Sequence, residues 1–472
     1  MKQLHHFLTY PAIVKLTRFI DAFQIAIIFI TLLFVSVSCS EDDPAILNEQ
    51  DPEPQPTEFE VPAISDIVMY EVNIRAFGPG SDFNAVIDRL DAIKAQNVNV
   101  IWLMPIHPVG EVNSVNSPYA VKDYKAVNPE FGTMAEFKTL VEEAHSRNIA
   151  VIIDWIANHT AWDNNWIENK SWYSQDGSGN IISPPGTGWN DVADLNFDSQ
   201  EMRAAMIEAM KFWIEETDID GYRCDAADFV PFDFWQEALN ELISIPEKEL
   251  VLLAEGARTD HFDAGFQINY GWEFYGKLKD IFAGEQSAYW LYTTHNSEYD
   301  GLPEGTHRLR FTTNHDESAW DATPMVLFNG KEGAFAASVI TTLLGGIPLI
   351  YGSQEVGTYN NIPFFSQSTI NWSANPDLLT SYQDLFAFYA NSEVVRYGEL
   401  ETYNHSQVIC FKRVHQQNEV LVLVNTSQDV VSYQMDPELQ NSQWIDGLDG
   451  SDVTLGMTVQ LGGYACFIFE SL

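Results

Sequence analysis

The chain has 472 residues, enough for one large domain and a smaller one. Its formal net charge of -43, from 67 acidic and 24 basic residues, argues against nucleic acid or an anionic membrane surface as a partner and favours a neutral one. Aromatic residues make up 13% of the chain, and their flat faces suit the apolar faces of sugars, although many of them will fill the core.

The first 39 residues have the features of an export signal. An apolar run over residues 22–37 follows two basic residues and ends at Ser38-Cys39. The run is short for a membrane-spanning helix, and its end resembles a bacterial lipoprotein processing site, where the cysteine becomes the lipidated N-terminus. We therefore predict export and a lipid anchor on Cys39, at the outer membrane or cell surface. An uncleaved signal anchor, or release into the periplasm or medium, are the alternatives.

Residues 40–62 read as a tether. They combine acidic residues with five prolines and show no apolar periodicity, which is typical of a stiff, solvated linker. The acidic run over residues 41–43 also resembles the surface-export tags of some Gram-negative lipoproteins. A plain solubilising linker explains it equally well.

Between residues 63 and 397 the chain alternates strand-like and helix-like stretches, which indicates parallel strands joined by crossover helices. The apolar runs of strand length are Ile67–Ile74, Val98–Met104, Ile149–Ile153, Gly221–Cys224, Leu250–Ala254, a weaker run at Phe266–Tyr270, Leu309–Thr313 and Ile347–Tyr351. Eight such units predict an α/β fold of the (β/α)₈ TIM barrel type.

Two segments depart from this alternation. About residues 160–198 follow the third strand and are rich in Gly, Pro, Asn and Trp, so we expect a short inserted subdomain before a helix that Asp198 caps. Residues 398–472 lose the helical pattern and alternate, which predicts a C-terminal antiparallel β domain of sandwich type. Cys410 and Cys466 lie there, and the sequence leaves open whether they pair.

Polar side chains end four of the predicted strands. Asp154 ends the third, Arg223 and Asp225 the fourth, Glu255 the fifth, and His315-Asp316 follows the seventh. In a barrel these ends meet at one face. Arg223 and Asp225 are two residues apart and point the same way in a strand, and the guanidinium favours the ionised carboxylate that a nucleophile needs.

These four segments resemble, in order, the signature regions of the α-amylase superfamily of retaining glycoside hydrolases. Ala193-Asp194-Leu195-Asn196 and Pro118-Tyr119 resemble two further regions, so that the resemblance covers the chain from about Ile64 to Leu472. It implies that Asp225 is the nucleophile, Glu255 the general acid/base and Asp316 the third carboxylate. It also implies substrate-binding roles for Tyr119, His159, Arg223 and His315.

The chain differs from the family pattern just after the nucleophile. Phe229 stands where a histidine is common, and Asp228 where a lysine or another substrate-binding residue is common. Many members bind Ca²⁺, and Asn158 and Asp194 match ligand positions. With these departures and the short insertion, a calcium cofactor stays an open alternative. Asp154 is expected to brace the barrel mouth rather than to react.

The resemblance implies an exported hydrolase of α-1,4-linked glucans, starch or maltooligosaccharides, that acts by double displacement. Debranching, cyclodextrin-cleaving and transglycosylating enzymes share the same regions and are alternatives. A non-catalytic surface glucan-binding protein is a further one, although all three carboxylates are present. Four tryptophans of the insertion could line sugar subsites or form its core: Trp162, Trp166, Trp172 and Trp189.

Overall fold

The computed structural model of the chain describes residues 59–472. The predicted signal peptide, Cys39 and nearly all of the predicted tether lie outside the described residues. Across residues 59–472, no helix is both long enough and apolar enough to cross a membrane.

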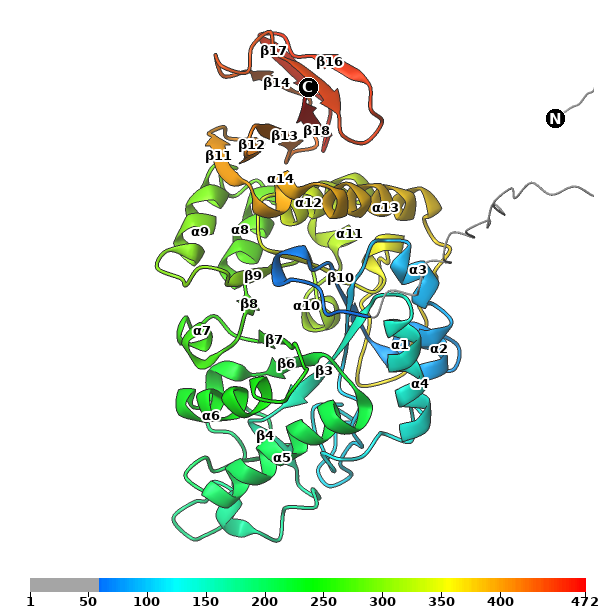
Figure 1. The fold of residues 1–472 in the computed structure, drawn as a ribbon, viewed down its shortest axis with the longest axis vertical. Coiled ribbons are helices and arrows are strands. Elements are labelled where there is room, and N and C mark those ends of the chain that lie inside the picture. Colours follow the sequence, from blue (N-terminus) through cyan, green and yellow to red (C-terminus); the bar gives the residue numbers. More distant parts are fainter. Residues whose placement is uncertain (1–58) are drawn as a thin grey trace, which may run out of the picture. The chain divides into compact units, whose positions relative to one another are not determined.

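Eight parallel strands close into a barrel, which confirms the predicted fold class (Figure 1). Going round the barrel, the order is β1, β10, β9, β8, β7, β6, β3 and β2. The strands are β1 (Met69–Val72), β2 (Val100–Leu103), β3 (Ala150–Ile156), β6 (Gly221–Asp225), β7 (Val251–Ala254), β8 (Ile268–Tyr270), β9 (His307–Arg310) and β10 (Ile347–Tyr351).

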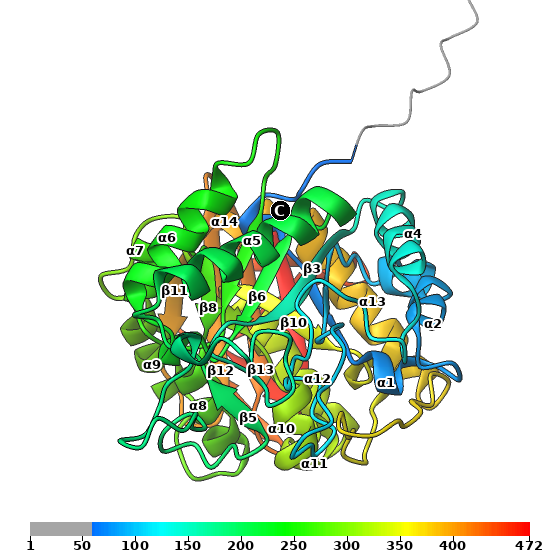
Figure 2. The ribbon, with the colours of Figure 1, turned by 90° about the horizontal axis from the view of Figure 1, so that it is seen from below.

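Helices surround this barrel (Figure 2). They are α1 (Ile74–Phe77), α2 (Phe83–Ile87), α3 (Leu90–Lys94), α4 (Met134–His145), α5 (Gln200–Thr217), α6 (Phe232–Ile243), α7 (Asp260–Ala264), α8 (Trp272–Phe282), α9 (Trp290–Tyr299), α10 (His315–Trp320), α11 (Pro324–Leu327), α12 (Lys331–Leu343), α13 (Pro376–Asn391) and α14 (Glu393–Tyr397). Short 3₁₀ turns lie at Ile64–Asp66, Lys170–Trp172, Ala227–Phe229 and Gln354–Val356.

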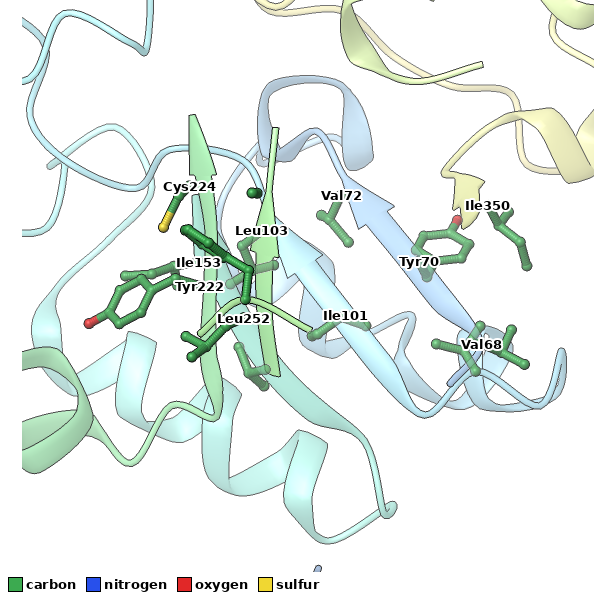
Figure 3. Packing of buried hydrophobic residues seen from close by; sticks show 14 of the residues in the cluster. Val68, Tyr70, Val72, Ile101, Leu103, Ile153, Tyr222, Cys224, Leu252 and Ile350 are labelled. Carbon is green, nitrogen blue, oxygen red and sulfur yellow. The ribbon is translucent and has the colours of Figure 1, made fainter. Parts of the chain in front are cut away.

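The strand alternation divides the core into two layers. Side chains such as Tyr70, Ile101 and Tyr222 point outward and pack against the helices (Figure 3). Their neighbours, such as Met69 and Trp102, point into the barrel. Because successive side chains of a strand face opposite sides, every second residue of each strand continues the inward row to the carboxyl end.

One glycine is required by the strand packing. Gly221 begins β6 with a φ of 142°, and a Cβ atom there would lie 2.0 Å from the backbone oxygen of Val251 in β7. Any larger residue would push the two strands apart, which would displace the carboxyl ends that follow. Gly221 therefore helps to set where Arg223 and Asp225 lie.

Two expected elements differ from the structure. The seventh strand spans His307–Arg310 rather than Leu309–Thr313, because Arg308 and Arg310 are buried in it through bonds to Asn269 and to Glu298 of α9. Helix α5 is capped by Ser199 and not by Asp198, since the Ser199 hydroxyl accepts the hydrogen bond from the Met202 N–H at 3.3 Å.

The insertion after β3 is held by a small antiparallel ribbon of β4 (His159–Ala161) and β5 (Val192–Asp194). Its register places His159 opposite Asp194. Trp166 packs against Tyr124 and Trp172, whereas Trp189 lines a cavity. Three of the four tryptophans, Trp162, Trp166 and Trp172, thus pack against the hydrophobic core.

The C-terminal segment forms antiparallel sheets, as predicted. Six strands are ordered β11, β12, β13, β18, β15 and β16, and β14 pairs with β17. Their bounds are β11 (Glu399–Tyr403), β12 (Val408–His415), β13 (Asn418–Asn425), β14 (Val431–Gln434), β15 (Gln443–Asp446), β16 (Asp452–Thr454), β17 (Thr458–Leu461) and β18 (Cys466–Ser471). Cys410 and Cys466 are free thiols on strands that β13 separates.

Candidate active site

The polar ends of the strands continue the inward rows of the barrel. Asp154 follows Ile152, Glu255 follows Leu253, and Glu71 follows Met69, each two residues on from a side chain that fills the barrel. The apolar part of each row packs the interior, and its last member is polar. The barrel mouth therefore collects charged groups from several strands above an apolar floor.

A cavity of about 510 Å³ opens at this mouth. Five of the seven predicted site residues line it, namely Tyr119, His159, Asp225, Glu255 and Asp316. Arg223 and His315 lie directly behind the lining, hydrogen-bonded to it. The structure thus brings together all seven residues from five separate parts of the chain.

Arg223 is the centre of this cluster. Its Nη1 lies 2.8 Å from Asp154 Oδ1 and 2.9 Å from Asp225 Oδ1, and its Nη2 lies 3.0 Å from Glu255 Oε1. Only 1% of the side chain is exposed, so these bonds are shielded from water. One guanidinium cannot neutralise three buried carboxylates, so the cluster favours at least one bound proton.

Glu255 has the surroundings of a protonated acid. Burial raises the pKa of its carboxyl group to about 7, and the neighbouring Asp225 and Asp316 carboxylates act in the same direction against Arg223. Its Oε2 accepts the N–H of Ala226 at 2.7 Å, from the loop that follows β6. Ala226 adopts a left-handed conformation, with a φ of 45°, which turns this N–H toward Glu255.

Asp225 departs in part from the expectation. Burial, together with the Asp154 and Asp316 carboxylates, raises its pKa to about 6. The Arg223 guanidinium lowers the pKa, but by less than these effects raise it. The pKa of Glu255, raised to about 7, still lies above that of Asp225.

His315 and Tyr119 form a second hydrogen-bonded group beside the carboxylates. The Tyr119 hydroxyl lies 2.6 Å from His315 Nε2 and 3.1 Å from Asp154 Oδ2. The two rings stack, with centroids 5.5 Å apart. His315 Nε2 also lies 3.4 Å from Asp316 Oδ2, and its Nδ1 lies 2.5 Å from Glu71 Oε1.

Two aromatic walls flank the carboxylates. Trp189 and Phe229 form one, with centroids 5.7 Å apart, and His159 packs on Trp189. The other comes from α10 and the loop after β10, and consists of Trp320, Phe364 and Phe365. Phe229 is 56% exposed and lines the cavity.

Asp228 binds the loop that follows Glu255. Its carboxylate accepts the N–H of Ala257 at 3.2 Å and of Arg258 at 3.3 Å, and it lies 3.4 Å from His261 Nε2. The residue that replaces a family substrate-binding lysine thus joins the loops after β6 and β7. It adds negative charge on the same side of the cavity as Phe229.

The two predicted calcium ligands lie close in the fold. Asn158 precedes His159, which pairs with Asp194, and the Asn158 amide nitrogen lies 3.2 Å from His159 Nδ1. Calcium takes six to eight oxygen ligands, which include backbone and amide carbonyls as well as carboxylates. In the described part of the chain, no three His, Cys, Asp or Glu side chains are grouped to hold a metal. A calcium cofactor therefore stays a prediction.

Sequence reasoning missed several residues of the site. Glu71 is one of them. It could have been found as the single charged residue of an otherwise apolar strand, at a position whose side chain points into the barrel. Trp320, Phe364 and Phe365 had no local signal, because only the tertiary fold brings α10 beside the loop after β10.

The chain matches the family described as "Alpha amylase, catalytic domain" over residues 54–179 and 187–444. It is 26% identical over 421 residues to the α-amylase MalA of Haloarcula japonica, covering 84% of this chain and 60% of that protein. It is also 26% identical over 385 residues to a cyclomaltodextrinase of Thermoanaerobacter pseudethanolicus, covering 75% of this chain and 65% of that protein.

The fold has close counterparts among solved structures. An α-amylase from Lactobacillus plantarum superimposes with a TM-score of 0.79 at 26% identity, covering 87% of this chain and 100% of that one. A maltogenic α-amylase from Thermotoga neapolitana superimposes with a TM-score of 0.78 at 24% identity, covering 87% of this chain and 99% of that one, which supports the fold alone.

Proposed function

The chain belongs to the α-amylase catalytic-domain family of glycoside hydrolases, and from this premise we propose that it hydrolyses α-1,4-glucosidic bonds of starch or maltooligosaccharides with retention of configuration. One observation carries the proposal. A single buried guanidinium, that of Arg223, binds both Asp225 and Glu255. Retaining enzymes need two carboxyl groups about 5 to 5.5 Å apart, and the shared guanidinium keeps Asp225 and Glu255 close together.

The roles follow from the two environments. Asp225, ionised beside Arg223, attacks the anomeric carbon, while protonated Glu255 donates its proton to the departing oxygen. A glycosyl ester on Asp225 results. Glu255, now ionised, removes a proton from water, and the water oxygen displaces Asp225 and releases the sugar.

The remaining residues bind the sugar. Asp316 lines the cavity and would hold substrate hydroxyls through its carboxylate. Tyr119 would stack under the sugar whose bond is cleaved, and His159 and His315 would donate hydrogen bonds from either side. Asp154 would act through Arg223, since it is fully buried and bonded to that guanidinium.

Two variants test the assignment. Asp225→Asn and Glu255→Gln should each lower kcat/KM on maltooligosaccharides by at least about 10³-fold while the thermal unfolding profile stays cooperative. Asp91→Asn is the control, because its carboxylate is 85% exposed and remote from the cavity, and it should be fully active. Near-normal turnover by either active-site variant would contradict these catalytic roles.

The anomeric form of the first product tests the retaining mechanism. Proton NMR during the first minutes of hydrolysis should show the α anomer ahead of its mutarotation. Early appearance of the β anomer would exclude a covalent intermediate on Asp225.

A second candidate function is transglycosylation or cyclodextrin cleavage. It is favoured by Phe229, an exposed apolar ring that lines the cavity and on which an acceptor sugar could stack. Digests of soluble starch, pullulan and cyclodextrin, analysed for products longer than the substrate, separate these activities. Binding of glucan with no product from any of the three would point to the non-catalytic alternative.

We also propose that the protein is exported and anchored by a lipid on Cys39, on the strength of the apolar run over residues 22–37 and the residues at its end. Labelled palmitate should be incorporated by the full chain in a bacterial host and not by Cys39→Ser. Equal membrane retention of both forms would favour an uncleaved signal anchor instead.

A further inference from the structure

Glu71 is a buried carboxylate that none of the proposed chemical steps uses. It lies on β1, points into the barrel and is fully buried. Its Oε1 lies 2.5 Å from His315 Nδ1 and 3.4 Å from the His315 backbone nitrogen. Its Oε2 has no hydrogen-bond partner among residues 59–472. Burial raises the pKa of this carboxyl group, and the contacts with His315 act against that rise.

A continuous series of contacts connects Glu71 to the nucleophile. His315 Nε2 lies 2.6 Å from the Tyr119 hydroxyl, which lies 3.1 Å from Asp154 Oδ2. Asp154 Oδ1 then accepts from Arg223 Nη1 at 2.8 Å, and the same nitrogen lies 2.9 Å from Asp225. Each contact is short enough to contain one proton.

The donors along this series can be assigned. An ionised Glu71 only accepts, so His315 Nδ1 carries a proton. Tyr119 has one hydroxyl proton to share between His315 and Asp154. If His315 Nε2 carried no proton, it would accept the proton of the Tyr119 hydroxyl. It would also face the Asp316 carboxylate, so that two acceptors would lie against each other with no proton between them. With a proton on Nε2, His315 donates to the Tyr119 oxygen, and the Tyr119 hydroxyl donates to Asp154. Each contact of the series then contains one proton.

We propose that Glu71 is a positioning residue that holds His315 as an imidazolium and thereby sets the direction of the hydrogen bonds from His315 through Tyr119 to Asp154. The importance of this role for catalysis rests on the proposed function. Glu71 does not line the cavity, and its side-chain hydrogen bonds go to His315.

The charges around His315 support this protonation state. The ionisable groups that face it or its partners are Glu71 on β1, Tyr119 after β2, Asp154 on β3, Arg223 and Asp225 on β6, Tyr270 on β8, Tyr351 on β10 and Asp316 on α10. Burial alone would lower the pKa of His315, but Asp316 and Glu71 raise it to about 9 against the opposing charge of Arg223. Removing the charge of Glu71 removes one of the two main contributions.

The consequence concerns substrate binding and the nucleophile together. As an imidazolium, His315 keeps its Nε2 proton toward Tyr119 and Asp316, and Tyr119 is held flat for a sugar to stack on it. With a neutral His315, Tyr119 turns its proton to the imidazole, and Asp154 loses a donor. Asp154 would then compete more strongly with Asp225 for Arg223.

Titration of His315 by NMR tests the proposal directly. The full chain, labelled with ¹⁵N-histidine, has 11 histidines, and the His315 signal is the one missing in His315→Asn. Wild type should retain the imidazolium signal at pH 7.5. In Glu71→Gln, which keeps the shape of the side chain and removes its charge, the midpoint should fall by about 1 to 3 pH units.

Glu355→Gln is a matched control. Glu355 is also fully buried and bonds to the Tyr70 hydroxyl at 2.6 Å, but it does not contact His315. The control should leave the His315 midpoint at its wild-type value. An unchanged midpoint in Glu71→Gln would overturn the proposal, since it would mean that the charge of Glu71 does not hold the proton on His315.

Kinetics test whether Glu71 acts through His315. At pH 6.5, Glu71→Gln should lower kcat/KM by about fivefold or more, whereas adding it to His315→Asn should cost less than about twofold further. Equal losses in both backgrounds would show an independent, structural effect of Glu71. If Glu71→Gln does not fold, Glu71→Leu serves, because it also removes the charge, and its His315 midpoint should fall as well. A wild-type midpoint in that variant would overturn the proposal.

The two proposals fail in different ways. A wild-type enzyme that releases no sugar from any α-glucan refutes the proposed function, and the NMR titration still decides the role of Glu71. An active enzyme whose His315 titrates identically with and without Glu71 refutes the role of Glu71 alone.

Discussion

Arg223 determines the chemistry of the site more than any other single residue. It binds three carboxylates, and its full burial makes each bond strong. Burial in the same cluster raises the pKa of the Asp225 carboxyl group to about 6 and that of the Glu255 carboxyl group to about 7. Burial, acting against this one shared guanidinium, thus leaves the pKa of Glu255 above that of Asp225.

The two pKa values predict a narrow bell-shaped pH profile for kcat/KM. Activity should fall as the pH rises through about 7, because Glu255 then loses the proton that it must donate. It should also fall as the pH drops through about 6, because Asp225 becomes protonated and cannot attack. The measurement is kcat/KM on a maltooligosaccharide from pH 4 to 9.

A substrate with a good leaving group provides the control for this assignment. With an α-maltosyl fluoride, the departing fluoride needs little protonation, so the alkaline side of the profile should flatten while the acid side stays. An alkaline limb that is identical for both substrates would assign that limb to a group other than Glu255.

Loops rather than strands decide what the site can bind. The strands end in charged residues, whereas the walls come from the insertion, from the turn after β6, from α10 and from the loop after β10. Trp189 reaches the cavity because the β4 and β5 ribbon folds the insertion back over the mouth. Such loops can vary without disturbing the barrel.

Trp189→Ala should lower kcat/KM on long maltooligosaccharides by about tenfold, with most of the loss in KM. Stacking on an aromatic face contributes about 1 to 2 kcal/mol, and Trp189 is 37% exposed at the cavity. Steady-state kinetics on maltoheptaose measure it. Trp290→Ala is the matched control, since Trp290 is 42% exposed on α9, away from the cavity. A loss of similar size in both variants would refute a specific role for Trp189.

At the start of α5, two adjacent residues compete for the N-cap, and the structure selects Ser199. Ser199→Ala should lower the free energy of unfolding by about 1 kcal/mol, because the Met202 N–H loses its acceptor. Asp198→Ala should change it by less than about 0.5 kcal/mol, since only the weak helix-dipole contribution of Asp198 is lost. Urea unfolding monitored by circular dichroism compares them. The reverse ranking would restore Asp198 as the cap.

On the scale of the whole molecule, charge dominates. With 67 acidic and 24 basic residues, the folded chain repels itself, and burial of further acids in the site adds to the cost. A neutral sugar is neither attracted nor repelled by this net charge, and it does not screen it. Stability and substrate binding should therefore respond differently to salt.

Added NaCl should raise the melting temperature by several degrees, mostly below about 0.3 M, where the Debye length has fallen to roughly 6 Å. KM for a neutral maltooligosaccharide should change by less than about twofold over the same range. Differential scanning fluorimetry and initial rates measure the two. A melting temperature that rises steadily to 2 M would indicate exclusion of salt from the surface instead of screening.

Much of this protein could be predicted from local patterns. Alternation in short apolar runs marks the barrel strands, and the polar residue that ends an inward row is found by counting two residues at a time, as at Arg223, Asp225 and Glu255. This works because a strand repeats every second residue and a barrel gathers all carboxyl ends at one face.

Tertiary structure alone decided the rest. Glu71 and His315 are 244 residues apart, and no local pattern predicts their bond. Burial outweighs Arg223 at Asp225 because desolvation depends on everything packed around a group, not on its neighbour in sequence. The sequence by itself determined which residues line up at the barrel mouth. Only the folded chain decided their protonation, because protonation depends on the sum of burial and charge from every side.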